Sequence, residues 1–225
     1  MRARRETRVA VSALVGIAAY GLEVRPWLLN WGATREESAG PLPGDDLIAV
    51  PDLVATRAIT IRTSTDQVWP WIAQLGQGRG GFYSYDFLEN LVGCDIHSAD
   101  RLVAAWQDVA VGDEVKLFPD GPLGVAALEA GRSLVLRGGV PMGNILPPYD
   151  FTWAFELREQ PNGTTRLLVR ERYAYSQWWA PLLVEPAAAV SFVMSRKMLR
   201  GIRGRAERPA PPVGNLARQE SGHPS

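Results

Sequence analysis

A histidine flanked by aspartates is the main candidate for acid–base chemistry in this sequence. Asp95, His97 and Asp100 lie within six residues of one another. A carboxylate beside an imidazole can exchange protons near neutral pH. The same grouping can instead hold a loop in place, with His97 bonded to the backbone or to Asp100. This structural interpretation is favoured, because a single histidine is weak evidence for catalysis. His97 and Asp100 are therefore the candidate catalytic residues, with a structural role as the alternative.

Two arginines on one predicted strand are candidates for binding an anionic group. Arg170, Glu171 and Arg172 are consecutive, so strand alternation places both arginines on one face and Glu171 on the other. If the arginines point into a cavity, their paired N–H donors could order a ligand carboxylate or enolate. If they point outward, they hydrate the sheet, as arginine more commonly does. Both orientations remain open.

Aromatic residues near a glycine-rich segment suggest the wall of an apolar site. Four glycines occur within residues 76–81, and the segment lacks the Gly-Lys-Ser/Thr ending of a phosphate loop. It could form a lid over a cavity or a structural turn whose aromatic residues cap the core. Aromatic side chains suit either use. The candidate ligand-binding residues are Phe82, Tyr83, Tyr85, Trp106, Trp153, Phe155, Arg170 and Arg172.

Composition excludes several classes of function. Lys and Arg together number 24, as do Asp and Glu, and the absence of a basic surplus argues against a nucleic-acid partner. The chain has two histidines and one cysteine, in no spacing typical of a metal site. No metal or cofactor is therefore expected.

The elements that would position these residues follow from hydrophobic periodicity. A strand over residues 56–62 precedes a helix that ends near Gly76, and a short helix is expected over residues 86–93. A long helix then closes the pattern over residues 180–207, with apolar positions at Ala187, Val190, Met194, Met198 and Ile202. Further strands are expected between these helices, over residues 113–118, 125–129, 133–137, 150–158 and 165–175. This order predicts an α+β helix-grip fold, in which a curved antiparallel sheet wraps around a long C-terminal helix.

Several segments carry a family resemblance. They include residues 74–86, residues 88–90, residues 95–100 and the Val111-Gly112-Asp113 sequence ahead of a strand. In these segments and in its element order, the chain resembles the START/Bet v 1-like (SRPBCC) superfamily, and within it a polyketide cyclase/dehydrase-like bacterial branch. The resemblance covers roughly residues 53–207. It implies a cavity for a hydrophobic molecule, while the fold alone does not decide the activity.

The ends of the chain differ from this domain in composition. Residues 32–52 are rich in glycine, proline and acidic residues and are predicted to be a linker. Residues 53–207 form the predicted ligand-binding domain. Residues 208–225 are rich in proline and polar residues and are predicted to be a disordered tail.

Residues 1–31 contain basic residues followed by an apolar run from Val9 to Leu22. Three interpretations remain open: a single membrane anchor through residues 9–31 with the domain outside, a signal peptide, or a helix packed on the domain. The anchor is preferred, which predicts a cell-membrane location. The alternative location is cytoplasmic.

Two functions fit these features. The first is a carrier or sensor that binds a lipid, quinone or polyketide-like molecule in an internal cavity. The second is a cyclase/dehydratase-type enzyme acting on a polyketide-like substrate. A wholly apolar cavity favours the carrier, whereas two or more titratable groups within hydrogen-bond reach favour the enzyme.

Overall fold

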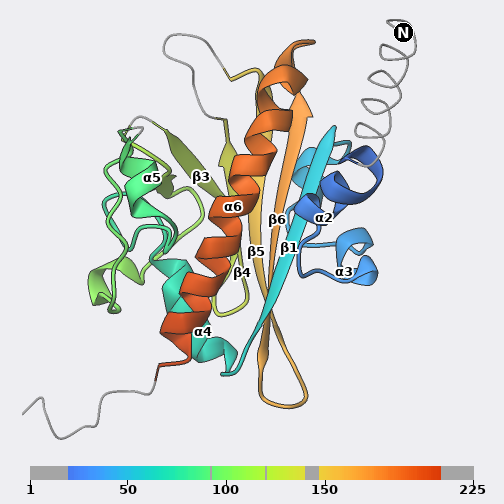
Figure 1. Cartoon of the computed structure of the whole chain (residues 1–225). Helices are drawn as coiled ribbons and strands as arrows, with labels where there is room; N and C mark the ends of the chain where they lie inside the picture. Colours follow the sequence, from blue (N-terminus) through green and yellow to red (C-terminus); the bar gives the residue numbers. More distant parts are fainter. Residues whose placement is uncertain (1–19, 92, 120, 140–146, 209–225) are drawn as a thin grey trace, which may run out of the picture.

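The computed structural model describes residues 20–91, 93–119, 121–139 and 147–208. Six strands form one antiparallel sheet in the order β1-β6-β5-β4-β3-β2, and the long helix α6 (Ala180–Ala206) crosses one face of it (Figure 1). The architecture is the α+β helix-grip arrangement that the element order predicts. The strands are β1 (Leu53–Ile61), β2 (Glu114–Lys116), β3 (Pro122–Glu129), β4 (Ser133–Gly138), β5 (Tyr149–Glu159) and β6 (Thr165–Tyr175).

The β5–β6 hairpin contains the two longest strands and lies between β1 and β4 in the sheet. Its strands pair from Tyr149 opposite Tyr175 to Glu159 opposite Thr165. The turn between them contains Asn162-Gly163, a pair typical of tight hairpin turns, and Gly163 adopts a φ of 75°, which glycine tolerates without a Cβ clash. Alternation along both strands therefore decides which side chains face α6.

The helices are mostly short apart from α6. They are α2 (Arg25–Leu29), α3 (Arg35–Ala39), α4 (Thr65–Ala73) and α5 (Asp86–Leu91), with a π-helical turn at Tyr20–Val24 and 3₁₀ turns at Asp45–Ile48 and Ala104–Trp106. The apolar stripe predicted for α6 is correct at Met198 and Ile202, which are buried, but Ala187 and Val190 are exposed. The upper half of α6 instead turns Val184 and Phe192 inward.

The main core lies between the inner face of the sheet, α4 and α6. Ile61, Leu136 and Leu167 project from three strands toward Ile72 of α4 and Leu199 of α6, and all five are fully buried. Burial of such side chains is the principal stabilising contribution to a fold of this kind. Near the middle of α6, over residues 191–198, this packing opens into a cavity.

Residues 32–52, predicted as a linker, pack on the outer face of the sheet. The segment contains α3, which begins with a capping box between Thr34 and Glu37, and the 3₁₀ turn at Asp45–Ile48. Leu42 is buried against Ala58 and Leu168. The segment is therefore part of the folded unit, and its turn-rich composition reflects a tight path over the sheet.

The region predicted as a membrane anchor is described only in part. Residues 1–19 lie outside the described residues. Within them the anchor stays a prediction. In the following segment, Trp27 packs against Phe192 of α6 with ring centroids 5.0 Å apart, and Arg25 pairs with Glu185 at 2.7 Å. Among the residues that the structure describes, none forms a helix long and apolar enough to span a bilayer.

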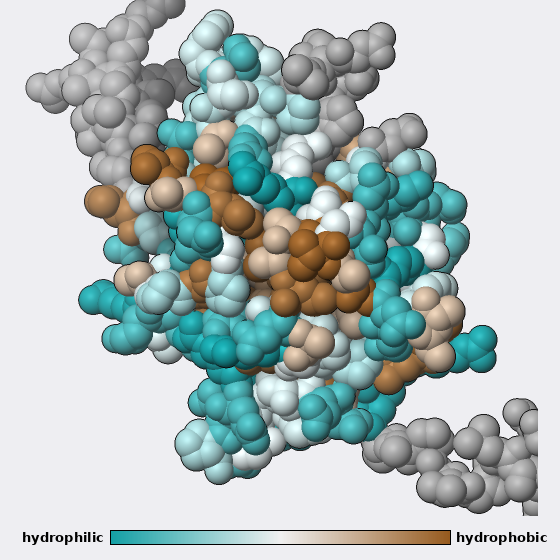
Figure 2. Space-filling model, turned by 180° about the vertical axis from the view of Figure 1, so that it is seen from behind, coloured by the Kyte–Doolittle hydropathy of each residue, from teal (hydrophilic) through white to brown (hydrophobic). Residues whose placement is uncertain are grey.

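The face opposite α6 has a mixed surface. Figure 2 shows hydrophobic residues gathered near the middle of this face within a mostly hydrophilic surround. The predicted tail over residues 209–225 lies outside the described residues.

Candidate functional site

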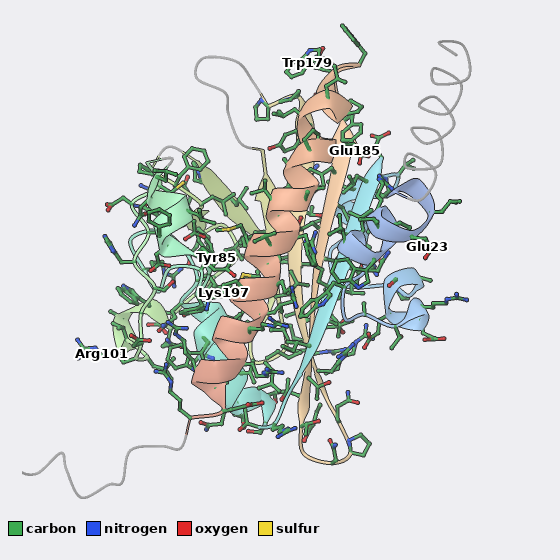
Figure 3. The ribbon with its side chains drawn as sticks, viewed as in Figure 1. Glu23, Tyr85, Arg101, Trp179, Glu185 and Lys197 are labelled. Atoms are coloured by element: carbon green, nitrogen blue, oxygen red, sulfur yellow. The ribbon has the colours of Figure 1, made fainter. Side chains whose placement is uncertain are left out.

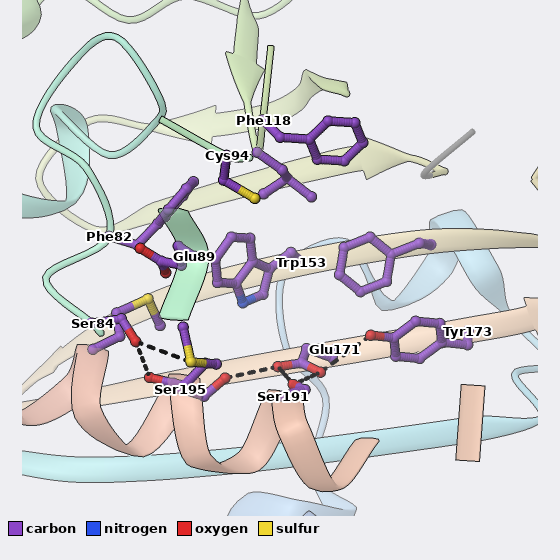
Figure 4. A pocket seen from close by; sticks show the side chains of 14 residues that line it. Phe82, Ser84, Glu89, Cys94, Phe118, Trp153, Glu171, Tyr173, Ser191 and Ser195 are labelled. Atoms are coloured by element: carbon purple, nitrogen blue, oxygen red, sulfur yellow. Dashed lines mark hydrogen bonds between the residues drawn. The ribbon is translucent and has the colours of Figure 1, made fainter. Parts of the chain in front are cut away.

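A cavity of about 290 Å³ lies between α6, the β5–β6 hairpin, α5 and the residues after the glycine-rich segment (Figure 4). This volume is near the lower end of the roughly 300–1,000 Å³ range of small-molecule sites. Most of the wall is aromatic or sulfur-containing. The lining residues are Phe82, Ser84, Glu89, Cys94, Leu117, Phe118, Phe151, Trp153, Glu171, Tyr173, Ser191, Met194, Ser195 and Met198.

Glu171 is the centre of a polar network on one side of the cavity (Figure 4). Its carboxylate accepts hydrogen bonds from Ser191 at 2.7 and 2.8 Å, from Ser195 at 3.0 Å and from the Tyr173 hydroxyl at 3.3 Å. Arg57 completes the network with a 2.7 Å ion pair to the same carboxylate. A buried carboxylate with this many donors is compensated in charge and in hydrogen bonding.

Local geometry explains how the network assembles. Arg57 lies on the same face of β1 as Ile59 and Ile61, and Glu171 lies on the same face of β6 as Val169. The two strands are neighbours in the sheet, with Ala55 opposite Glu171. Ser191 and Ser195 are four residues apart on α6, so both hydroxyls project from one helix face toward the sheet.

Burial also affects the acidity of Tyr173. Loss of solvation, reinforced by the adjacent Glu171 carboxylate, holds the pKa of Tyr173 well above its usual value. The phenol therefore keeps its proton at neutral pH and remains a donor to Glu171. The side of the cavity formed by β6 and α6 is a hydrogen-bonded wall rather than a reactive acid–base pair.

Glu89 differs from Glu171 because it has no compensating partner. It projects from α5 toward the cavity, and its Oε2 atom is buried without a hydrogen bond. Burial raises the pKa of Glu89 to about 7, and repulsion from the Asp86 carboxylate adds to the rise. Glu89 can therefore change its protonation state near neutral pH inside the cavity.

Trp153 is the second lining residue with an unsatisfied polar atom. Its Nε1–H is buried and has no acceptor within the described residues. The indole lies against Phe82 and Phe155, with ring centroids 5.8 and 4.8 Å away. An indole N–H in this position can donate only to a water or a bound molecule.

The structure places two of the predicted ligand-binding residues, Phe82 and Trp153, on the cavity wall. Phe155 lies behind Trp153 in the core and does not reach the cavity. Tyr83 is also in the core, where its hydroxyl donates to the carbonyl of Trp71 at 3.0 Å. Burial raises the pKa of Tyr83 to about 12, so it stays a neutral structural residue.

Tyr85 and Trp106 lie outside the cavity. Tyr85 is 42% exposed, and Lys197 of α6 lies 5.6 Å from its ring centroid (Figure 3). Trp106 ends a 3₁₀ turn, where its carbonyl accepts a hydrogen bond from Arg79. Arg79 belongs to the glycine-rich segment, which backbone bonds between Gly76 and Gly81 close into a tight turn. A lid role for this segment stays a prediction.

Arg170 and Arg172 face away from the cavity, so their assignment to ligand binding does not fit the structure. Alternation along β6 turns both outward while Glu171 points in. Arg170 is 2% exposed, because residues 37–45 cover it and accept its hydrogen bonds. Both arginines pair with Asp45, at 2.6 and 3.1 Å. They hold the N-terminal segment on the sheet.

The histidine–aspartate group is at the surface. The side chains of His97 and Asp95 are 82% and 73% exposed, with 3.3 Å between Nε2 and Oδ1. Asp100 pairs with Arg205 and Arg208. None of the three lines the cavity, so the catalytic assignment of His97 and Asp100 finds no support in the geometry. In the described part of the chain, no group of three or more His, Cys, Asp or Glu side chains could hold a metal ion.

Comparisons with known proteins find similarity of structure but not of sequence. No family model and no curated protein matches the chain. Similar solved structures include protein MLL2253 from Mesorhizobium loti, with 14% identity over 71% of this chain and 100% of that one and a TM-score of 0.43. Hypothetical protein jhp0584 from Helicobacter pylori has 11% identity over 77% and 99%, with a TM-score of 0.46.

Truncated norcoclaurine synthase from Thalictrum flavum has 10% identity over 70% of this chain and 95% of its own, with a TM-score of 0.44. With TM-scores of 0.43 to 0.46 and identities of 14% or less, these three matches assign no family to this chain. No residue role is transferred from them.

Sequence reasoning missed the polar residues of the cavity. Arg57 and Glu171 each lie on the otherwise apolar face of a strand, and their charges are opposite. This pattern could have predicted a buried ion pair. Ser191 and Ser195 likewise interrupt the apolar face of α6 at helical spacing. For Glu89, the position within a six-residue helix carried no comparable signal.

Proposed function

We propose that this protein binds a small, mostly apolar organic molecule in the cavity between α6 and the β5–β6 hairpin, as a carrier or sensor. The observation that supports this most is the wall itself, where Phe82, Phe118, Phe151 and Trp153 line a space that the side chains of the described residues leave open. Concave sites that are mostly apolar and carry a few polar groups are typical of small-molecule binding. A bound molecule would remove the accessible apolar surface of this wall from water.

The polar groups favour binding over catalysis. Glu171 and Tyr173 are titratable and lie within hydrogen-bond reach of each other, which is the pattern expected of an enzyme. The Glu171 carboxylate is, however, paired with Arg57 and saturated with donors, and Tyr173 keeps its proton. Such a network orients a ligand and fixes the shape of the site.

A cyclase/dehydratase-type enzyme remains the second candidate because of Glu89. Its pKa of about 7 places a carboxyl group that can both give and take a proton at the cavity wall. Once a ligand is identified, an activity assay distinguishes the two functions. Under the enzyme proposal, the wild type converts the ligand over time into a product with a different chromatographic retention, and with a lower mass where water is lost. Glu89→Gln should bind the ligand and leave it unchanged. A carrier returns it unchanged in both proteins.

Native mass spectrometry of gently purified full-length protein tests the binding function. We expect a small organic molecule to co-purify and to be lost in Cys94→Trp, which fills the cavity. Cys94→Ala is the matched control, because it leaves the space open and should retain the molecule. Ligand-free wild-type protein from several expression hosts, together with no binding of added apolar compounds, would refute the proposal.

A further inference from the structure

The hydrogen-bond inventory of the cavity indicates which ligand chemistry it accepts. The hydroxyl protons of Ser191 and Ser195 are committed to Glu171, and that of Ser84 to the carbonyl of Met194 at 3.0 Å. The Tyr173 proton is committed to Glu171 as well. These four groups can therefore offer a ligand only oxygen lone pairs.

The charges of the cavity point the same way. Two carboxyl groups, Glu89 and Glu171, line it, and no lysine, arginine or histidine is among its described lining residues. Arg57 compensates Glu171 from behind, but Glu89 has a buried oxygen without any partner. An anionic ligand would meet an uncompensated carboxyl and no free cation, which is unfavourable in a poorly solvated site. A cationic donor on the ligand would neutralise the Glu89 carboxylate and supply its buried oxygen with a hydrogen bond.

The aromatic wall suits the same ligand. Phe82, Phe118, Phe151, Trp153 and Tyr173 surround the cavity, and their ring faces attract a cation as well as an apolar body. Trp153 Nε1–H is a buried nitrogen donor on this wall, and the described residues offer it no acceptor. An oxygen atom on the ligand body would accept this hydrogen bond.

We propose that the cavity selects an organic amine, whose ammonium group binds the Glu89 carboxylate while its apolar body lies against the aromatic wall. This inference rests on the proposed binding function and specifies its ligand class. It excludes fatty acids and other carboxylates as the main ligands. A hydroxyl or ether oxygen on the body would add a bond to Trp153.

The surroundings of Glu89 make this contact dependent on pH. Asp86 on the same helix and burial both raise the pKa of Glu89, and the nearby Cys94 thiol has its own pKa raised by burial and by Glu89. Across the cavity, β6 contributes Glu171 and Tyr173. An ammonium group binds the ionised form of Glu89, so amine binding should strengthen as pH rises through about 7 and should release a proton below that pH.

Isothermal titration calorimetry with three ligands of one skeleton tests the proposal: naphthylethylamine, naphthylethanol and naphthylacetic acid. At pH 8 we expect the amine to bind the wild type about tenfold or more tightly than the alcohol, and the acid to bind most weakly. Glu89→Gln should lower amine affinity to about that of the alcohol, so that the amine preference is lost. Glu159→Gln, at an exposed position of β5, is the matched control and should keep the amine preference.

The outcomes separate this proposal from the binding function on which it rests. If none of the three compounds binds the wild type and no small molecule co-purifies with it, the binding function itself fails. If a molecule co-purifies but none of the three compounds binds, the amine inference alone is overturned. If they bind but the acid equals the amine, or if Glu89→Gln keeps the preference, the cavity binds ligands and the amine inference is overturned. If Glu89→Gln does not fold, titrations of the wild type at two pH values test the inference instead. The ratio of amine affinity to alcohol affinity should fall from pH 8 to pH 5.5, and an unchanged ratio overturns the inference.

Discussion

Arg57 and Glu171 form an ion pair inside the protein, with 2.7 Å between Nη1 and Oε1 and only 1% and 5% of their side chains exposed. They project from the neighbouring strands β1 and β6 toward α6, where Ser191 and Ser195 bond to the same carboxylate. The Arg57 Nε atom also donates to the carbonyl of Leu28 in α2. One buried pair therefore connects the sheet, the long helix and the N-terminal segment at the wall of the cavity.

Replacing Arg57 with methionine should destabilise the protein by about 3–5 kcal/mol, because it leaves the Glu171 charge buried without its cation. The double variant Arg57→Met/Glu171→Met should lose less than the single variant, although the serine hydroxyls then lack their acceptor. Urea unfolding measures both. Arg132→Met is the control: its ion pair with Glu129 is exposed, and we expect a change within about 1 kcal/mol. A single variant as stable as this control would contradict the prediction.

Glu89 should make stability fall as pH rises from about 4.5 to about 7. Its ordinary pKa is 4.5, and burial raises the folded-state value to about 7. Between these values the folded state binds more protons than the unfolded state, so a rise in pH favours unfolding. Glu89→Gln removes this slope and should be more stable than the wild type at pH 8 but not at pH 4.5. Urea midpoints at the two pH values test this. Glu159→Gln should show no such crossover.

Arg170 should be essential for holding residues 32–52 on the sheet. It bonds to Thr56, to Asp45 and to the carbonyls of Glu37, Ser38 and Gly40, a set that needs the planar guanidinium. Arg170→Lys should cost at least about 2 kcal/mol, because several of these buried acceptors lose their donor. Limited proteolysis should then cut within residues 32–52. Arg132→Lys is the matched control, and equal resistance of the two variants would refute the role.

Strand periodicity predicted the fold well because one side of each strand is buried. Residues 165–175 were expected as a strand and form β6 with the same bounds, since their apolar positions alternate and an Asn-Gly turn precedes them. The same alternation correctly separated Glu171 from Arg170 and Arg172. The alternation could not predict whether the arginines or Glu171 point toward the core, because the answer depends on which segment covers the outer face of the sheet.

The cavity was less predictable because it depends on packing between elements far apart in sequence. Apolar residues of a short helix are normally expected to point inward, yet Phe87 and Leu91 of α5 are 75% and 72% exposed while Glu89 faces the cavity.

The linker prediction for residues 32–52 differs from the structure for a related reason. Their glycines, prolines and acidic residues resemble a linker, but the bonds that hold them come from arginines of β6.

Gly201 and Gly204 on α6 provide a matched test of how the helix supports the cavity wall. A Cβ on Gly201 would overlap the carbonyl oxygen of Tyr83, which precedes the lining residue Ser84, whereas a Cβ on Gly204 would meet open space. Alanine favours a helix over glycine by about 1 kcal/mol, so Gly204→Ala should stabilise the protein by up to that amount. Gly201→Ala should instead destabilise it by about 1–3 kcal/mol, because α6 and the Tyr83 backbone must separate. Thermal unfolding measures both, and we expect Gly201→Ala alone to weaken binding of the co-purifying ligand. If both substitutions raised the melting temperature, the close contact between α6 and Tyr83 would not exist in solution.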